Sequence, residues 1–315
     1  MTIDIHCHLW IEEFLPKAYL NELAKFLADW STNMGGKAAT PEEIAQAVFP
    51  EYWDPDGDAT IRQMDEAGIE KTVIMPTDFG LGIGEAAKTI EQQNKHLAEV
   101  AKKHPDRLVY FFGIDPRREG ALELFETSVK EWGARGLKLL PFTGFYPDEG
   151  EAYALVEKAS QWNLPLLIHI GPEFPPFDSK YAHPSRLDRI LADFPELPVI
   201  AAHLGIIWWR ELIDLARLRK NLMCDFSGLQ MTAIPNYAQF CHILRRVLDG
   251  FGMHRVMFGT DGPPYDPLIS KKQWVGCVMD LSCRTPEGIT FSDEEVFALV
   301  HGNAQSLLAS TGQKT

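Results

Sequence analysis

Residues 165–203 read PLLIHIGPEFPPFDSKYAHPSRLDRILADFPELPVIAAH, and this stretch indicates the fold most directly. Its two short apolar runs, at 165–170 and 199–203, have the length and composition of buried β-strands. Between them, residues 185–194 carry apolar side chains at helical spacing. A strand, a helix and a second strand in this order are typical of two parallel strands joined by a crossover helix.

The same alternation extends over the whole chain. We predict eight strands, at residues 3–8, 72–76, 108–114, 136–141, 165–170, 199–203, 222–226 and 256–260. Amphipathic helices are predicted between them at residues 59–67, 121–132, 152–162, 185–194, 209–218 and 237–248. A final helix is predicted at 293–308, because Ser292 and Glu295 have the spacing of a capping box. This pattern favours an α/β fold of the (β/α)8 TIM-barrel type, with residues 1–315 as one domain, over a doubly wound sheet.

Residues 9–58 are too many for a simple connection after the first strand. They are expected to contain one helix at 16–30 and a shorter one at 41–49. Loops that follow barrel strands surround the functional end of the barrel. This insertion is therefore expected to lie over the mouth of the barrel, as a lid or as a subunit contact.

Composition limits the class of protein. Apolar residues make up 45% of the 315 residues and charged residues 23%, which is typical of a globular protein. A net charge of −14 argues against nucleic acid or an anionic membrane as a partner. There is no apolar run long enough to span a membrane and no signal-peptide pattern, so we expect a cytoplasmic protein that acts on a small molecule.

Five polar residues fall at the ends of predicted strands. His6 and His8 are two positions apart on the first strand, so their rings face the same side. His169 and His203 end the two strands of the opening stretch, and Asp261 follows the last strand. In a TIM barrel these positions meet at one rim, where catalytic residues lie. A single histidine at a strand end can have a purely structural role, but five such residues together predict a metal-binding or proton-transfer site.

Several motifs resemble those of one known family. They are His6-Cys7-His8, Gly136-Leu137-Lys138-Leu139, Gly144-Phe145-Tyr146-Pro147, Leu167-Ile168-His169, Ala202-His203-Leu204-Gly205, Asp225-Phe226-Ser227-Gly228 and Val256-Met257-Phe258-Gly259-Thr260-Asp261. With these motifs, nearly the whole chain resembles the amidohydrolase-related metal-dependent enzymes, which include aminocarboxymuconate-semialdehyde decarboxylase. The resemblance implies that His6, His8, His169 and Asp261 hold one divalent ion, usually zinc, and that His203 is the acid/base residue.

Lys138 has more than one possible role. In some related binuclear hydrolases, a carboxylated lysine on the fourth strand bridges two metals. Lys138 can instead pair with Asp4 or Asp261, or bind a carboxylate of the substrate. The decarboxylase branch of the family resembles mononuclear sites, which favours an ion pair or contact with the substrate.

Two reactions fit the predicted residues. In the first, a hydrolase, the ion activates water, Asp261 accepts a proton, and His203 stabilises the oxyanion or protonates the leaving group. In the second, a non-oxidative decarboxylase or a hydratase, the substrate is an unsaturated or aromatic carboxylate and His203 or Asp261 protonates carbon. A non-catalytic binding barrel is the third alternative, against which the complete set of predicted ligands argues.

An anionic flat substrate requires arginine and aromatic side chains near the mouth. The candidates for substrate contact are Lys138, Phe174, Trp208, Trp209, Arg210 and Tyr265. The aromatic candidates can also be ordinary packing residues. The two adjacent tryptophans, which look exposed, and the 9–58 insertion also suggest a homodimer contact.

Overall fold

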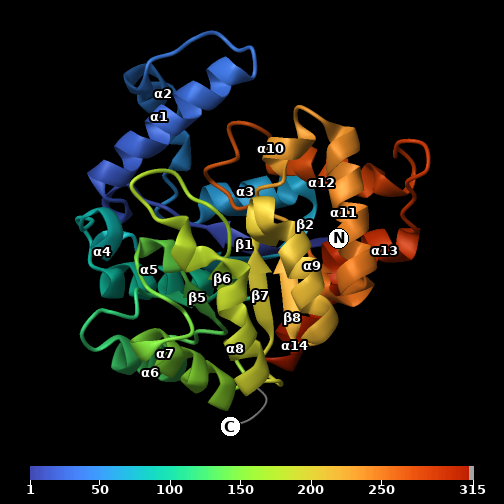
Figure 1. Cartoon of the computed structure of the whole chain (residues 1–315). Helices are drawn as coiled ribbons and strands as arrows, with labels where there is room; N and C mark the ends of the chain where they lie inside the picture. Colours follow the sequence, from blue (N-terminus) through green and yellow to red (C-terminus); the bar gives the residue numbers. More distant parts are fainter. Residues whose placement is uncertain (312–315) are drawn as a thin grey trace.

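The centre of the molecule is a ring of parallel strands that follow one another in chain order. The computed structural model describes residues 1–311. Within that range the strands are β1 (Thr2–His8), β2 (Ile69–Met75), β3 (Leu108–Tyr110), β4 (Phe112–Gly113), β5 (Leu137–Leu139), β6 (Leu166–His169), β7 (Val199–Ala202), β8 (Leu222–Asp225) and β9 (Val256–Met257). Neighbouring strands pair in parallel in two runs, β1 to β3 and β4 to β9. Figure 1 shows the strands surrounded by helices.

The ring closes between the first and the last strand. The backbone N–H of Ile5 donates to the carbonyl of Phe258 at 3.0 Å. The N–H of Asp261 donates to the carbonyl of His6 at 2.7 Å. These bonds connect β1 to the segment that follows β9. The architecture is therefore the predicted TIM barrel.

The predicted strand at 108–114 is interrupted at one residue. Phe111 lies between β3 and β4, and its N–H donates to the carbonyl of Ile74 at 3.0 Å. The N–H of Phe112 turns to the other neighbour and donates to the carbonyl of Gly136 at 2.9 Å. A Cβ atom at Gly136 would lie only 2.5 Å from the Phe111 ring, so glycine is required for this close approach.

The helices that follow the strands cover the outside of the ring. Those predicted from the sequence are α3 (Asp58–Ala67), α6 (Ala121–Glu131), α7 (Gly150–Gln161), α8 (Leu187–Asp193), α9 (Trp209–Leu218) and α11 (Tyr237–Phe251). The sequence analysis missed α4 (Gly80–Ile83), α5 (Ile90–Lys103), α10 (Gln230–Ala233) and α12 (Lys271–Met279). None of the helices in the described part of the chain is long and apolar enough to cross a membrane.

The predicted final helix at 293–308 is not continuous. It consists of α13 (Asp293–Phe297), one π-helical turn (Ala298–Gly302) and α14 (Asn303–Ser310). The predicted capping box is present, since the Ser292 hydroxyl accepts from the N–H of Glu295 at 3.1 Å. The wide turn has a tertiary cause: the carbonyl of Leu299 accepts from the N–H of Phe258 at 2.9 Å. A contact with the barrel thus overrides regular helix geometry.

The insertion after β1 forms α1 (Lys17–Asn33) and α2 (Pro41–Val48). Both lie at one end of the barrel and project away from it, at the upper left of Figure 1. The buried face of α1 carries Tyr19, Leu23 and Leu27. These side chains belong to an apolar cluster that also includes Phe79 and Phe142 of the barrel loops. Packing therefore fixes α1 against the rim.

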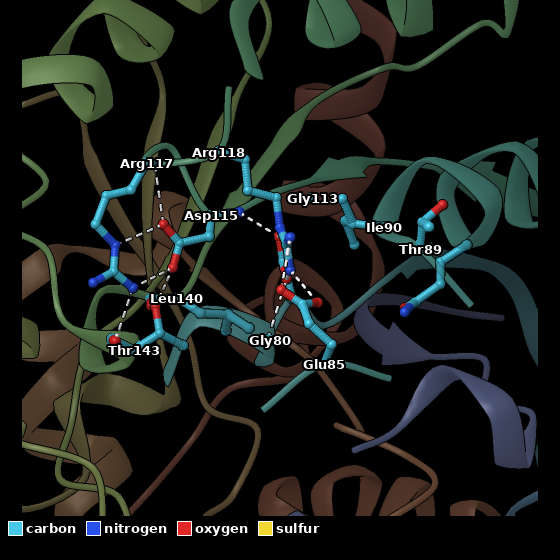
Figure 2. A network of polar contacts seen from close by, with 12 residues as sticks. Gly80, Glu85, Thr89, Ile90, Gly113, Asp115, Arg117, Arg118, Leu140 and Thr143 are labelled. Carbon is cyan, nitrogen blue, oxygen red and sulfur yellow. Dashed lines mark hydrogen bonds and ion pairs between the residues drawn. The ribbon is translucent and has the colours of Figure 1, made fainter. Parts of the chain in front are cut away.

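A polar network joins the loops after β2, β4 and β5. Nε of Arg118 lies 2.6 Å from a carboxylate oxygen of Asp78, whose side chain is 4% exposed. The other carboxylate of the network, Asp115, contacts Nη2 of Arg117 at 2.6 Å and accepts from the Thr143 hydroxyl at 3.0 Å. The backbone N–H of Asp115 also donates to Asp78 at 2.8 Å. Figure 2 shows Asp115, Arg117, Arg118 and Thr143 converging from separate loops, which the network holds together.

Candidate active site

The carboxyl ends of four strands bring the five predicted site residues together. His6 and His8 lie on β1, His169 ends β6, His203 follows β7, and Asp261 follows β9. Asp261 is central: its Oδ1 is 3.5 Å from Nε2 of His6 and 3.2 Å from Nε2 of His8. Its Oδ2 is 3.6 Å from Nδ1 of His203. The predicted convergence at one rim is thus present in the structure.

His169 completes the group from the side. Its ring centroid is 4.7 Å from that of His203, and the ring packs edge to face against Phe142 at 4.5 Å. Its Nε2 atom is buried and has no hydrogen-bond partner among the described residues. A buried nitrogen without a partner lowers the stability of the fold, and such atoms are often explained by a bound ion or ligand. This nitrogen is therefore available to a ligand.

The backbone is unusual at two of these residues. His203 has φ of 59° and Asp261 has φ of 49°, both in the left-handed region that non-glycine residues rarely adopt. At Asp261 the conformation is held by the hydrogen bond from its N–H to the carbonyl of His6. Such strain concentrates at functional sites, where it orients side chains. Here it turns both side chains toward the same group of atoms.

Two further residues of the site lie in a motif that the sequence analysis noted without giving them a role. Oδ2 of Asp225 lies 3.1 Å from Nδ1 of His6, and Oδ1 accepts from the N–H of His203 at 3.2 Å. The Ser227 hydroxyl lies 2.9 Å from Nδ1 of His203. Asp225 and Ser227 therefore orient the two rings, as partners of metal-ligating histidines usually do. The signal was the polar pair Asp225 and Ser227 at the carboxyl end of the predicted strand at 222–226.

Burial controls the ionisation of the site. It lowers the pKa of His6, takes that of His169 well below the ordinary value, and lowers that of His203 to about 4. Burial also opposes the charge of Asp261, but His203, His6 and His8 outweigh it and keep the pKa of this carboxyl low. Neutral imidazoles beside a carboxylate are the state that binds a cation.

Lys138 contacts a histidine and not a carboxylate. Its Nζ atom lies 2.8 Å from Nε2 of His6, and its side chain is 1% exposed. Burial lowers the pKa of Lys138 to about 8. Asp4, one of its predicted partners, accepts instead from the hydroxyl of Thr260 at 2.6 Å. The predicted pairing with Asp4 is therefore wrong, and among the described residues Lys138 forms no ion pair with Asp261 either.

The donor atoms fit a divalent metal. One donor atom each from His6, His203 and Asp261 lies within 4.8 Å of the others, and all three residues are buried. His8 contacts the same carboxylate, and the His169 ring, whose Nε2 atom is unpaired, lies beside that of His203. The closest set thus includes His203, to which the sequence analysis gave an acid/base role. Imidazole with carboxylate is a common ligand set for zinc and other divalent ions.

A cavity of about 700 Å³ opens onto these residues. Of the residues predicted to contact the substrate, those that line it are Lys138, Phe174, Trp209, Arg210 and Tyr265. Trp208 does not line it and packs against His183, with ring centroids 4.7 Å apart. The prediction of two exposed tryptophans is also wrong, because Trp209 is 8% exposed and carries the Arg210 guanidinium over its ring at 4.1 Å.

The insertion after β1 contributes to the same cavity. Tyr19, Leu23, Phe26 and Leu27 of α1 line it together with residues of the barrel loops. One wall of the cavity is therefore the helix that packs over the rim.

Solved structures share the fold over almost the whole chain. An uncharacterised TIM-barrel protein from Bordetella bronchiseptica is 23% identical, with 99% of each chain covered and a TM-score of 0.70. A dihydroxybenzoic acid decarboxylase from Polaromonas, with bound manganese and an inhibitor, is 18% identical (98% and 96% covered, TM-score 0.68). A probable 2-pyrone-4,6-dicarboxylic acid hydrolase from Acinetobacter baumannii is 16% identical (98% and 99% covered, TM-score 0.62).

Comparison with curated proteins finds no match. The sequence does match one family model, described as Amidohydrolase, over residues 3–309. That match spans the described barrel strands, apart from Thr2 at the start of β1, and contains all five residues of the rim. The chain therefore belongs to the amidohydrolase-2 family of enzymes, which confirms the resemblance seen in its sequence motifs.

Proposed function

We propose that this enzyme is a metal-dependent carboxy-lyase that removes the carboxylate from a flat aromatic or unsaturated acid. The observation that carries the proposal is the composition of the cavity. Eight aromatic side chains line it among aliphatic ones, Arg210 and Lys138 supply positive charge, and His8, His169, His203 and Asp261 lie along it. A flat anion is the ligand that such walls and charges recognise best.

The aromatic walls come from separate parts of the chain. Trp10 follows β1, Phe142 follows β5, and Phe174 follows β6, and all three line the cavity. Rings stack or meet edge to face, which orients a flat substrate without the need for many polar contacts. Arg210 lies over the Trp209 ring, which limits its motion and prepares its planar guanidinium for a carboxylate.

His6, His8, His169, His203 and Asp261 would hold the divalent ion or contact its ligands. When bound there, such an ion withdraws electron density from carboxylate or hydroxyl oxygens of a substrate. Asp261 can accept the proton of a hydroxyl next to the carboxylate and return it to the ring carbon. The carbon–carboxylate bond breaks, its electron pair forms the new C–H bond, and carbon dioxide leaves. His203, whose Nδ1 atom lies 3.6 Å from Oδ2 of Asp261, can assist the transfer of this proton to and from the carboxylate.

Hydrolysis is the second candidate function. It is favoured by the position of Asp261, whose carboxylate contacts His8 and faces the cavity. An ionised carboxylate there can take a proton from water that attacks a carbonyl carbon. One of the structural neighbours is a probable hydrolase of a pyrone dicarboxylic acid.

Product analysis tests the two functions. The protein is loaded with zinc or manganese and incubated in D2O with hydroxybenzoates, dihydroxybenzoates and a pyrone dicarboxylate. A carboxy-lyase releases carbon dioxide and an equal amount of product deuterated at the former carboxylate position. Asp261→Asn abolishes this, and Arg210→Ala raises KM. Ring opening without carbon dioxide would assign hydrolysis instead, and no turnover on any of these acids would reject the proposal.

A further inference from the structure

Glu173 is a carboxyl group on the cavity wall that the proposed chemistry does not use. It lies in the loop after β6, four residues beyond His169, and lines the cavity. One of its oxygens, Oε1, accepts from the N–H of Phe174 at 3.0 Å. Its own N–H donates to the Ser179 hydroxyl at 3.3 Å. The backbone thus holds one oxygen of the carboxyl, while Oε2 has no protein partner within residues 1–311.

The surroundings of this carboxyl are aromatic. The adjacent Phe174 packs against Tyr19 and Phe26, with ring centroids 5.5 and 5.9 Å apart. Tyr265 lines the same cavity. Burial among these groups raises the pKa of Glu173 to about 7. Among residues 1–311 no protein group bonds to Oε2, so a substrate in the cavity can take that place from water.

We propose that Glu173 determines substrate specificity by binding a ring hydroxyl and excluding substrates that carry a second carboxylate at that position. The inference rests on the proposed function, because it assumes an aromatic or unsaturated acid in the cavity. It divides that class into hydroxy acids, which the site accepts, and dicarboxylic acids, which it rejects.

The physical reason is the difference between the two substituents. A ring hydroxyl can donate a hydrogen bond to the free oxygen of Glu173. A carboxylate on the ring has no proton to donate at neutral pH, and its negative charge lies against that of ionised Glu173. A site built to bind a hydroxyl discriminates strongly against analogues that lack the donor, because its own polar group then stays unpaired.

Matched pairs of ligands test this discrimination. Meta-hydroxybenzoate and isophthalate share the ring and one carboxylate and differ only in the second substituent. Para-hydroxybenzoate and terephthalate form the second pair. Their affinities are measured by calorimetry at pH 8 on the zinc-loaded protein, for the wild type, Glu173→Gln, Glu173→Asp and Glu157→Gln. Glu157 is an exposed residue of α7 that does not line the cavity, so its variant controls for the loss of one charge.

We expect the wild type to prefer the hydroxy acid of at least one pair by about tenfold or more. Glu173→Gln should remove most of that preference by improving dicarboxylate binding, because the charge that repels the second carboxylate is gone. Binding of the hydroxy acids should change little, because the amide oxygen can still accept from a hydroxyl. Glu173→Asp, which keeps the charge, should retain the preference, as should Glu157→Gln. Thermal melting of each variant verifies that it is folded.

Equal affinities within both pairs in the wild type would overturn the inference, as would a preference that survives in folded Glu173→Gln. In either case the aromatic acids still bind, and the proposed function stands. If the wild type binds none of the four acids, the proposed function is wrong and the inference falls with it.

Discussion

The Nζ atom of Lys138 lies 2.8 Å from Nε2 of His6, and both side chains are almost completely buried. An ammonium group donates to a neutral imidazole at this distance, and His6 then directs its other nitrogen to Asp225. Nε2 of His6 is also one of the nitrogens that face Asp261. The lysine and a metal ion would therefore compete for the same nitrogen.

Metal content distinguishes the roles of Lys138. We expect about one divalent ion per chain in the wild type, measured by elemental mass spectrometry. Lys138→Met should keep that ion and bind it more tightly, because the competing ammonium is gone. Two ions in the wild type and one in Lys138→Met would instead show that the lysine bridges two metals.

His203→Asn separates an acid/base role from a ligand role. If His203 moves a proton, the variant keeps its metal and loses turnover by a factor of about 10² to 10⁴. If His203 is a ligand, as its place beside His6 and Asp261 allows, the metal is lost as well. Metal analysis and turnover on the same preparation decide between these roles. Full activity in the variant would exclude both.

Asp225→Asn should weaken metal binding without removing a ligand. The carboxylate orients the His6 ring at 3.1 Å and accepts from the N–H of His203, and the loss of such a partner typically costs about 10- to 100-fold in metal affinity. The measurement is a competition titration with a chelator. Asp214→Asn, at an exposed position on α9, is the control. Equal affinity in both variants would contradict the role given to Asp225.

Arg118→Ala should destabilise the fold. Its guanidinium contacts Asp78, which is 4% exposed, so the variant leaves a buried carboxylate without its partner. The expected loss in the free energy of unfolding is about 3 kcal/mol. Arg217→Ala removes an exposed ion pair with Asp214 and should cost about 1 kcal/mol or less. Urea denaturation measures both, and similar losses would show that the network in Figure 2 adds little.

Isophthalate binding should weaken as the pH rises from 6 to 7.5. The pKa of Glu173 is raised to about 7, so the carboxyl is largely neutral at the lower pH and becomes charged across this range. Its negative charge then repels the second carboxylate of the ligand. Calorimetric titrations at several pH values measure the effect, and Glu173→Gln should be independent of pH in the same window.

Several other groups at the cavity change charge outside that window. Burial raises the pKa of Tyr19 and Tyr265 well above 10, so both phenols stay neutral. The pKa of Asp261 is low, and those of His169 and His203 are lowered, so these groups do not gain or lose protons there. Lys138, with a pKa of about 8, sets the upper limit of the window. A pH effect that persists in Glu173→Gln would assign the titration to another group.

The sequence predicts the barrel well because strand and helix periodicity are local properties. It places His8 and His169 at strand ends correctly, and Asp261, four residues beyond β9, reaches the same rim because a barrel aligns those ends. The omission of α5 was avoidable, since Thr89 and Gln92 form a capping box that is visible in the sequence. The sequence does not show which residues of the rim face the cavity. Trp208 and Trp209 are adjacent, yet only the second lines it.

Local sequence patterns do not predict hydrogen bonds between residues that are distant along the chain. Asp4 bonds to Thr260, and Lys138 to His6, through contacts between strands far apart in the sequence. The π-helical turn before α14 has the same origin, because the Leu299 carbonyl bonds to Phe258. Each of these features depends on where the ring of strands closes and on the depth of each side chain in it.

The closure of the ring also sets when the site can exist during synthesis on the ribosome. His6 leaves the exit tunnel early, but its backbone carbonyl has no partner until the N–H of Asp261 has emerged. Its ring partners, Asp225 and Lys138, emerge in between. Until the chain has been translated past Asp261, His6 and His8 are two histidines without a carboxylate between them. A metal ion that needs the carboxylate of Asp261 could therefore bind only after the barrel is complete.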